Sequence, residues 1–264
     1  MNKIIIVNDE IKEKTVDDNI KLELLEKNIL FDVNSLKFKI EKDTSLIIEY
    51  DSTEKTKLDL FFDVDKDVNF NIYEIRKGIE TKVQYKYYLQ ANSNTNVFKF
   101  YYGDRIRELD IINLNGIGAK INYNFKTISS KHQKYDMMIY HNYKNTYSNI
   151  YNRGLNIEDG ELIFNVTSIV DNGKVDCVIN QNNRIINMNN RKCKINPNLL
   201  IEENDAFANH SALIGKFSDE ELFYLQSRGI IKEEAQALLV KGFLLSGLEG
   251  EFKEKIENII DNRR

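Results

Sequence analysis

Val83-Gln84-Tyr85-Lys86-Tyr87 alternates apolar and polar side chains one by one, and much of the chain repeats this pattern. A period of two residues sends alternate side chains to opposite faces of a β-strand. Similar pieces recur between residues 4 and 200 at intervals of roughly 10 to 15 residues, separated by Asn, Asp, Gly and Ser. No amphipathic helix of ordinary length interrupts them. The pattern therefore predicts an all-β region.

Two all-β architectures are compatible with this pattern. A sandwich or barrel usually needs tight hairpin turns such as Asn-Gly or Asp-Gly. The region supplies Asn115-Gly116, Asp159-Gly160 and Asn172-Gly173, which are too few for a meander of so many strands. A β-solenoid also gives many short strands, with polar, Asn-rich corners. The sequence has no strict short repeat, but the scarcity of hairpin turns favours the solenoid.

The period of the sequence changes near residue 217. Ser218-Asp219-Glu220-Glu221 is a capping box, in which Ser218 caps a helix start and Glu221 reaches back to it. Residues 232–243 have apolar side chains at helical spacing, and residues 252–260 can form a third helix. We therefore expect a β domain over residues 1–216 and a small helical domain over residues 217–264.

Composition excludes several classes of protein. The chain has 264 residues and a net charge of -4, which argues against a basic nucleic-acid binder. No stretch approaches the roughly 20 apolar residues that span a bilayer, and the apolar run at residues 4–7 is too short for a signal peptide. Two cysteines, Cys177 and Cys193, do not make a disulfide scaffold in so long a chain. A reduced, cytoplasmic setting is expected.

Motifs of common enzymes are missing from the sequence. It contains no G-x-x-x-x-G-K-[ST] loop, no G-x-S-x-G elbow and no H-E-x-x-H pair. Cys177 and Cys193 lack the close spacing of a structural zinc site, and each is more typical of a buried small apolar side chain. Spacing alone gives His132, His141 and His210 no role beyond hydrogen bonding.

Residues 209–215 (NHSALIG), followed by residues 219–230 (DEELFYLQSRGI), resemble the SufB/SufD family. The proteins of this family are scaffolds of the SUF iron–sulfur cluster assembly system. Residues 197–201 and parts of residues 132–160 are also similar to the family, so the resemblance runs from about Gln90 to Phe243. It implies a right-handed parallel β-helix with a small C-terminal α-helical domain, in agreement with the solenoid and helices expected from the pattern.

The resemblance also implies a function. The chain is expected to be a non-catalytic scaffold subunit whose ATPase activity belongs to a partner, the ABC-type ATPase SufC, which explains the missing phosphate-binding loop. A SufB-like paralogue or a second copy of the chain is expected to pair with the β-helix, and neither nucleic acid nor membrane is expected to bind. The residues implied to bind SufC are Leu222, Phe223, Tyr224, Arg228, Gly229, Ala235, Leu239 and Phe243.

Within the family the chain is more similar to SufD than to SufB. SufB scaffolds have an acidic residue directly after the histidine that matches His210, and this sequence has Ser211 there. The essential SufB cysteine falls near Asn182 by ungapped spacing, although a small gap would bring Cys177 to that position. A thiolate is the ligand that iron–sulfur clusters demand. His210 is therefore the candidate ligand of iron or of a transient cluster at a subunit interface, with Cys177 as the second candidate.

Two alternatives and two further expectations stay open at this point. One alternative is a minimal SufB-like homodimer that uses Cys177 or Cys193 as its thiolate. A remote alternative is a β-helix enzyme acting on polysaccharides, which needs carboxylate pairs or basic residues along one face. The acidic residues show no such clustering in the sequence. The helical region that precedes the β-helix in familiar relatives is expected to be absent, and no stably bound cofactor is expected in the isolated chain.

Overall fold

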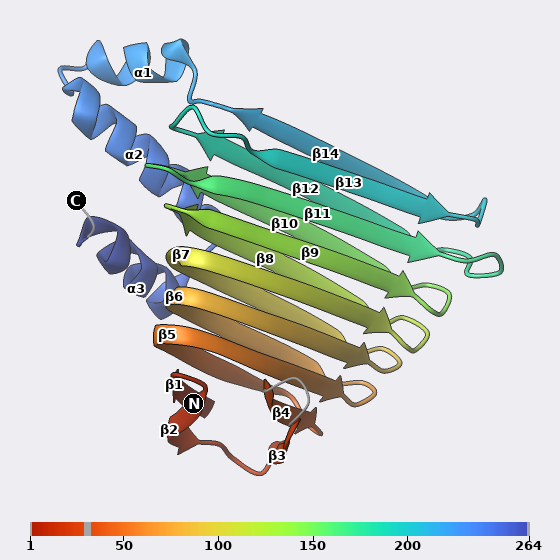
Figure 1. The fold of residues 1–264 in the computed structure, drawn as a ribbon. Coiled ribbons are helices and arrows are strands. Elements are labelled where there is room, and N and C mark those ends of the chain that lie inside the picture. The colour runs from red at the N-terminus through yellow and green to blue at the C-terminus, as the bar shows by residue number, and fades with distance from the viewer. Residues whose placement is uncertain (1, 29–32, 263–264) are drawn as a thin grey trace.

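The computed structural model describes residues 2–28 and 33–262, without the side chains of residues 26–28. Strands occupy most of the described chain up to Gly215 and three helices follow (Figure 1). The strands are β1 (Asn2–Val7), β2 (Glu10–Thr15), β3 (Ile20–Asn28), β4 (Val33–Ile40), β5 (Thr44–Val64), β6 (Asn69–Leu89), β7 (Asn94–Leu114), β8 (Lys120–Ser129), β9 (His132–His141), β10 (Tyr147–Asn156), β11 (Glu161–Val170), β12 (Val178–Asn187), β13 (Lys194–Ile201) and β14 (Phe207–Gly215). The helices are α1 (Asp219–Gln226), α2 (Lys232–Leu245) and α3 (Gly250–Asp261).

From β4 onward the strands stack in parallel, each turn of the chain lying on the one before it. Asn96 Nδ2 donates to Asn71 Oδ1 at 2.9 Å across 25 residues, and Asn122 Nδ2 donates to Asn96 Oδ1 at 2.9 Å across 26 residues. Such a ladder of stacked amides forms only when successive turns lie in register. The fold is a parallel β-solenoid of about seven turns with a C-terminal helical part, which confirms the predicted fold class.

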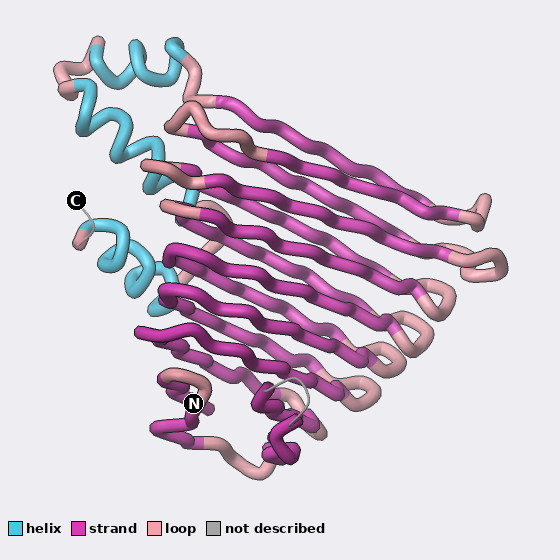
Figure 2. Tube along the Cα trace, in the orientation of Figure 1, coloured by secondary structure: helices cyan, strands magenta, loops and turns pink. Residues whose placement is uncertain are grey.

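Each turn, or coil, of the solenoid crosses two sheet faces. The first face contains β1, β8, β10, β12, β14 and the first halves of β5, β6 and β7. The second face contains β4, β9, β11, β13 and the second halves of the same long strands. Figure 2 shows the turns between coils following one another along one side of the stack.

Glycine allows two neighbouring coils to approach closely where the long strands pass from one face to the other. Gly78 pairs with Gly103. A Cβ atom on Gly103 would lie 2.3 Å from the carbonyl oxygen of Gly78, so no larger residue fits without moving the backbone.

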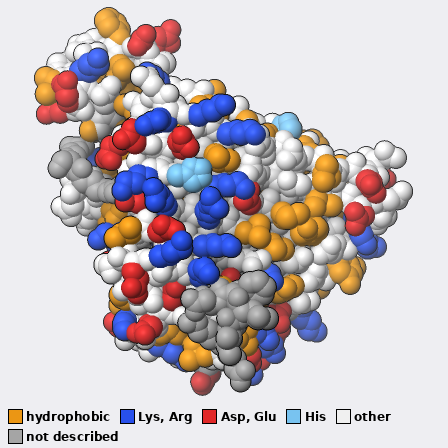
Figure 3. Space-filling view, viewed as in Figure 1, with side chains coloured by type: hydrophobic (Ala, Val, Ile, Leu, Met, Phe, Trp, Pro, Cys, Tyr) orange, Lys and Arg blue, Asp and Glu red, His pale blue; other side chains and the backbone are white. Residues whose placement is uncertain are grey.

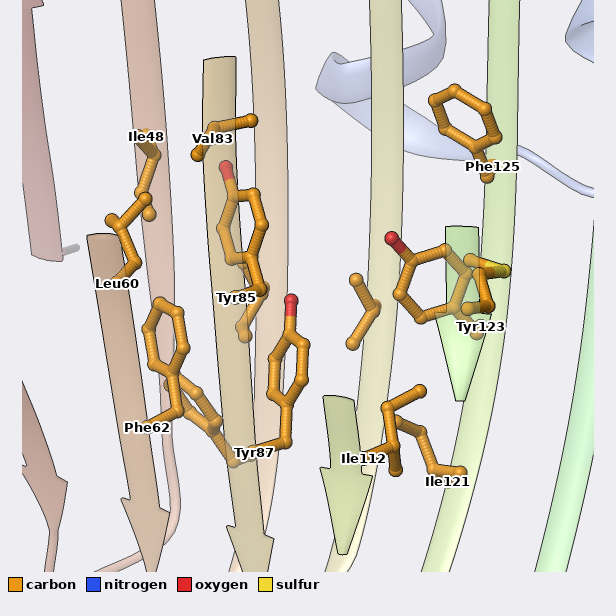
Figure 4. Packing of buried hydrophobic residues seen from close by; sticks show 14 of the residues in the cluster. Ile48, Leu60, Phe62, Val83, Tyr85, Tyr87, Ile112, Ile121, Tyr123 and Phe125 are labelled. Carbon is orange, nitrogen blue, oxygen red and sulfur yellow. The ribbon is translucent and has the colours of Figure 1, made fainter. Parts of the chain in front are cut away.

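The side chains that point into the solenoid fill its lumen. Val83, Tyr85 and Tyr87 are buried and the alternate residues Gln84 and Lys86 are half-buried, as the alternation predicts. Neighbouring rings stack from coil to coil: the ring centroids of Phe62 and Tyr87 are 5.3 Å apart at an interplanar angle of 12° (Figure 4). Burial of this continuous apolar column is the main source of stability in such a fold.

The first two pairs of strands depart from the solenoid pattern. β1 pairs with β2 and β3 pairs with β4 in antiparallel fashion. Asn8 and Asp9, which join β1 to β2, both have positive φ angles, 50° and 65°. Two such residues form the tight hairpin turn that matches the twist of antiparallel strands, so Asn8-Asp9 is a hairpin that the sequence reading missed.

The helical part begins as predicted. Ser218 caps α1, its hydroxyl accepts a hydrogen bond from the Glu221 backbone N–H, and the Glu221 side chain accepts one from the Ser218 backbone. α2 and α3 cover the outside of the first sheet face, where Phe243 and Ile256 share an apolar cluster with Leu155. In contrast, α1 has no buried residue. None of the helices in residues 2–28 and 33–262 is long and apolar enough to cross a membrane.

Candidate functional site

The last coil leaves the solenoid with an open edge. β14 pairs with β12 and β13 pairs with β11, and neither strand has a further partner among the described residues. Large apolar side chains on this coil are exposed: Leu200 by 57%, Phe207 by 65% and Leu213 by 54%. An unpaired edge with exposed apolar residues favours pairing with another chain, because solenoid ends need a cap.

His210 lies in the middle of this open edge. It pairs in register with Gln181 of β12, whose side chain points into the lumen and is 2% exposed. Gln181 Nε2 donates to Ser168 Oγ at 2.9 Å and to the carbonyl oxygen of Asn198 at 3.2 Å. His210 continues the inward-facing column but is itself exposed. Its imidazole therefore lies at the mouth of the lumen, accessible to a partner.

Cys177 directly precedes β12, the strand that pairs with the strand of His210, but its side chain has a different environment. Its side chain is fully buried, and its Sγ atom lies 3.2 Å from Thr146 Oγ1 and 3.4 Å from the carbonyl oxygen of Tyr143. The Phe207 N–H donates to the Cys177 carbonyl oxygen, and His210 follows three residues later, about 10 Å further along the strand. The interpretation of Cys177 as a buried small residue is confirmed.

Cys193 is half-buried directly before β13, on the second sheet face. Burial raises the pKa of its thiol, against the effect of a hydrogen bond from the backbone of Leu162. A raised pKa disfavours the thiolate, which is the form that binds metals. Within the described part of the chain no group of three or more His, Cys, Asp and Glu side chains could hold a metal ion.

The other two histidines are held by the solenoid itself. His132 Nδ1 lies 3.3 Å from Glu161 Oε2 on the neighbouring strand. His141 is 2% exposed, and its two ring nitrogens lie 2.8 Å from Thr146 Oγ1 and 2.9 Å from Ser148 Oγ. Burial lowers the pKa of His141 to about 3. Both histidines have structural hydrogen bonds, as spacing alone suggested.

The pKa of His141 predicts how stability depends on pH. Because its folded pKa lies below its unfolded value of about 6.5, folding releases a proton between those two pH values. The contribution is complete above pH 6.5 and is lost as pH falls toward 3. We expect His141→Asn, which cannot titrate, to remove about 2 kcal/mol of the decline in unfolding free energy between pH 6.5 and 4.5. Urea denaturation of both proteins at several pH values measures this, and parallel declines would contradict it.

The residues implied to bind the ATPase divide into two groups in space. Phe223 and Tyr224 on α1 are 71% and 56% exposed, and Gly229 after the helix is exposed. The Arg228 guanidinium lies 4.6 Å from the centre of the Tyr224 ring, a cation–π contact that joins the two exposed side chains. Leu222 is half-buried. These residues form one accessible surface at the tip of the helical part, which we call the α1 surface.

Three of the residues implied to bind the ATPase hold the helical part together instead. Ala235 is fully buried and Phe243 is 8% exposed, while Leu239 is half-buried against the same apolar cluster. The ring of Phe243 meets that of Phe217 edge-on, with centroids 6.4 Å apart. Leu239 and Phe243 pack α2 against the solenoid, and none of the three side chains belongs to the exposed α1 surface.

A buried charged network in the lumen was not found from the sequence. Arg76 Nη2 donates to Glu74 Oε1 at 2.9 Å and to the Tyr85 hydroxyl at 2.8 Å. One coil further, Lys99 Nζ donates to Glu108 Oε1 at 2.9 Å and to Asp110 Oδ1 at 3.0 Å. The side chains of Lys99, Glu108 and Asp110 are at most 1% exposed.

The sequence does contain a signal for these buried charges, which is the phase of the alternation between inward and outward side chains. Lys99 stands between the inward-facing Val97 and Tyr101, so the two-residue period puts its ammonium inside. Burial, and then the neighbouring Asp110 carboxylate, raise the pKa of Glu108 to about 7. This carboxylate pair lies inside the lumen and is not open to a glycan, so it gives no support to the polysaccharide-acting alternative.

Comparison with known proteins gives one family and several relatives. The family described as "SUF system FeS cluster assembly, SufBD core domain" matches residues 30–243. The chain is 35% identical to iron-sulfur cluster assembly protein SufD of Bacillus subtilis over 96 residues, which cover 36% of this chain and 22% of that protein. It is 44% identical to a SufBD family protein of Pyrococcus horikoshii over 68 residues, 25% of this chain and 15% of the relative. These alignments thus span less than a quarter of either relative's length.

Proposed function

The chain belongs to the SUF system FeS cluster assembly SufBD core family, and from this premise we propose that it is a SufD-like, non-catalytic scaffold for iron–sulfur cluster assembly. The observation that carries the proposal is the open edge of the last coil, with His210 at its centre and exposed apolar residues around it. The scaffold acts in the cytoplasm, where thiols stay reduced.

The open edge supports pairing with a SufB-like β-helix. Unpaired N–H and C=O groups along β13 and β14 can continue their ladders into strands of a second solenoid. Leu200, Phe207 and Leu213 lie in the outward-facing columns of the same coil, so a partner that also overlaps the outer faces would cover their exposed apolar surface. Pairing of the edge satisfies the backbone groups that disfavour a free solenoid end.

His210 would then hold the cargo between the two chains. Neutral imidazole is a common iron ligand, and a cluster also needs thiolates. Because Cys177 is buried and Cys193 has a raised pKa, we assign the thiolate to the SufB-like partner. The same two observations count against the homodimer that uses this chain's own cysteines.

The α1 surface would dock the ATPase SufC. Its Phe223 and Tyr224 side chains are exposed in the described chain, and aromatic and arginine side chains are the residues that most often dominate interfaces. ATP-driven association of two such partners would pull on the helical part and act on the edge that holds His210.

Co-expression with the SufB and SufC candidates encoded beside this chain tests the proposal. A tag on this chain should retain both, with a total mass fitting one SufB, one copy of this chain and two SufC. Retention of SufC alone, with this chain and SufC in equal amounts, would replace the proposal with the homodimer. Retention of neither would reject both.

Substitution of Phe223 by aspartate is expected to weaken retention of SufC. A central interface aromatic is worth about 2 kcal/mol or more, so affinity should fall by roughly 30-fold. Ile79→Asp is the matched control, because Ile79 is also an exposed apolar side chain, 53% exposed, but lies on β6 and not on the α1 surface. Binding of SufC by titration calorimetry measures both. Equal affinity of Phe223→Asp and the original protein would move the docking site away from α1.

A further inference from the structure

The outer surface of the second sheet face has a column of basic residues that the proposed function does not use. Lys57 pairs in register with Lys82, Lys82 with Arg107, and Arg107 with Lys134. Their Cα atoms follow one another at the strand spacing of about 4.8 Å. We call these four residues the basic ladder. In Figure 3, Lys and Arg side chains gather on the left part of this face and hydrophobic side chains on its right part.

The adjacent column shows how a purely structural surface is arranged here. It lies two residues toward the N-terminus on each strand, and its first three residues, Lys55, Glu80 and Arg105, alternate in sign. Lys55 Nζ lies 2.7 Å from Glu80 Oε1, and Arg105 Nη1 lies 4.0 Å from Glu80 Oε2. On the next coils His132 lies 3.3 Å from Glu161. Alternation of this kind stabilises neighbouring strands, because each charge faces an opposite one.

The basic ladder does not alternate. Lys134 pairs with Asp136 on its own strand at 2.8 Å, but Lys82 and Arg107 form no ion pair with any residue in the described ranges. Both are exposed. Like charges directly opposite one another on neighbouring strands are destabilising. Lys82 and Arg107 thus face each other as exposed like charges, with the Asp59 carboxylate near Lys82 and the Glu80 carboxylate near Arg107 as counter-charges. Two neighbouring exposed cations that lack a salt bridge within the described residues are suited to binding an anion.

A hollow of about 750 Å³ lies over the ladder. This volume is within the range of about 300 to 1,000 Å³ that is usual for small-molecule sites. The ladder and Lys86 form its cationic side, and Val33, Phe61 and Leu109 form its apolar side. Three acidic residues, Asp59, Glu108 and Asp136, also line it, so basic residues outnumber acidic ones by five to three. The ligand that fits this division carries negative charge at one end and an apolar or aromatic group at the other.

We propose that the hollow binds an organic phosphate. The phosphoryl chain lies along Lys82 and Arg107, and the apolar body lies over Phe61 and Leu109. The planar guanidinium of Arg107 can bind two phosphate oxygens at once, and Lys82 supplies a compact positive charge. Carboxylates on either side of the ladder, from Glu80 and Asp136, would repel a long polyanion, so a short phosphoryl chain is favoured over nucleic acid.

The test uses the full chain by itself, with ADP as the probe in titration calorimetry. We expect a dissociation constant on the order of 10 to 100 μM. The double variant Lys82→Ala/Arg107→Ala should weaken binding by more than about 10-fold, since two charge-assisted contacts are lost. Lys120→Ala/Lys144→Ala is the matched control, because it removes the same charge from exposed positions outside the ladder. The control should bind ADP as the original protein does.

Component probes separate the site from its alternatives. Pyrophosphate and adenosine should each bind more weakly than ADP, because each fills one side of the hollow. Equal binding of ADP by the ladder variant and the original protein would overturn the proposal. The absence of ADP binding at millimolar concentration would also overturn it. If ADP did not bind but a glutamate-rich peptide bound in a way that depends on the ladder, the face would be a protein-docking surface and the proposal would be wrong.

Discussion

Replacing His210 by alanine is expected to reduce iron–sulfur cluster assembly by at least about 10-fold while the fold stays intact. Loss of groups that only support a metal ligand costs 10- to 100-fold, so loss of a direct ligand should cost no less. The fold should tolerate the change because His210 is exposed on an edge strand. Substitutions at such positions usually alter stability by no more than about 0.5 kcal/mol.

The measurement is cluster reconstitution in the complex with the partner proteins, followed by visible absorbance and by iron and sulfide content. Asn209→Ala is the control, since Asn209 is also exposed but belongs to the column that points out of the lumen. His210→Cys should restore part of the assembly, because a thiolate can replace imidazole as a ligand. Normal assembly by His210→Ala, or failure of the control, would remove the imidazole from the proposed role.

Replacing Lys99 by methionine is expected to lower the free energy of unfolding by about 3 to 5 kcal/mol. Lys99 lies between Glu108 and Asp110 in the lumen, with its Nζ atom 2.9 Å and 3.0 Å from their oxygens. It also lies 3.3 Å from the centre of the Tyr85 ring. Methionine fills similar space but leaves two buried carboxylates without their cation. Removing one partner of a buried ion pair is costly for that reason.

Urea denaturation at two pH values distinguishes this cause from a packing defect. A protonated Glu108 needs no cation, and its pKa of about 7 means that the loss should be smaller at pH 6 than at pH 8.5. Lys82→Met is the matched control, because Lys82 is exposed and outside the network. The triple variant Lys99→Met/Glu108→Leu/Asp110→Leu should recover much of the stability. A loss below 1 kcal/mol for Lys99→Met alone would show that the lumen hydrates the carboxylates.

The alternation of side chains located the strands because it is a local property of the chain. Val83 to Tyr87 have the inward and outward positions that the alternation predicted. The capping box at Ser218 likewise located the start of α1, since its hydrogen bonds join residues within one turn. The Asn8-Asp9 hairpin was missed because those two residues adopt positive φ without the glycine that usually marks such a turn.

The candidate site was less predictable from the sequence. The resemblance to the family indicated His210 and the residues of the α1 surface as candidate site residues. It did not show that Phe223 is exposed whereas Phe243 is buried. Both aromatic residues lie in helices with similar local patterns. Which of them is exposed depends on what packs against each helix, and α1 has no neighbour that buries it.

The sequence by itself determined the strand phase, the helix starts and the family, because each follows from residues close together in the chain. Only the tertiary structure decided which residues share a column. Parallel hydrogen bonds fix the register between coils, and that register depends on the length of every turn between them. The register brings Lys82 beside Arg107 on the outer face, encloses Lys99 with Glu108 inside, and leaves His210 on a strand that has no further partner in the described part of the chain.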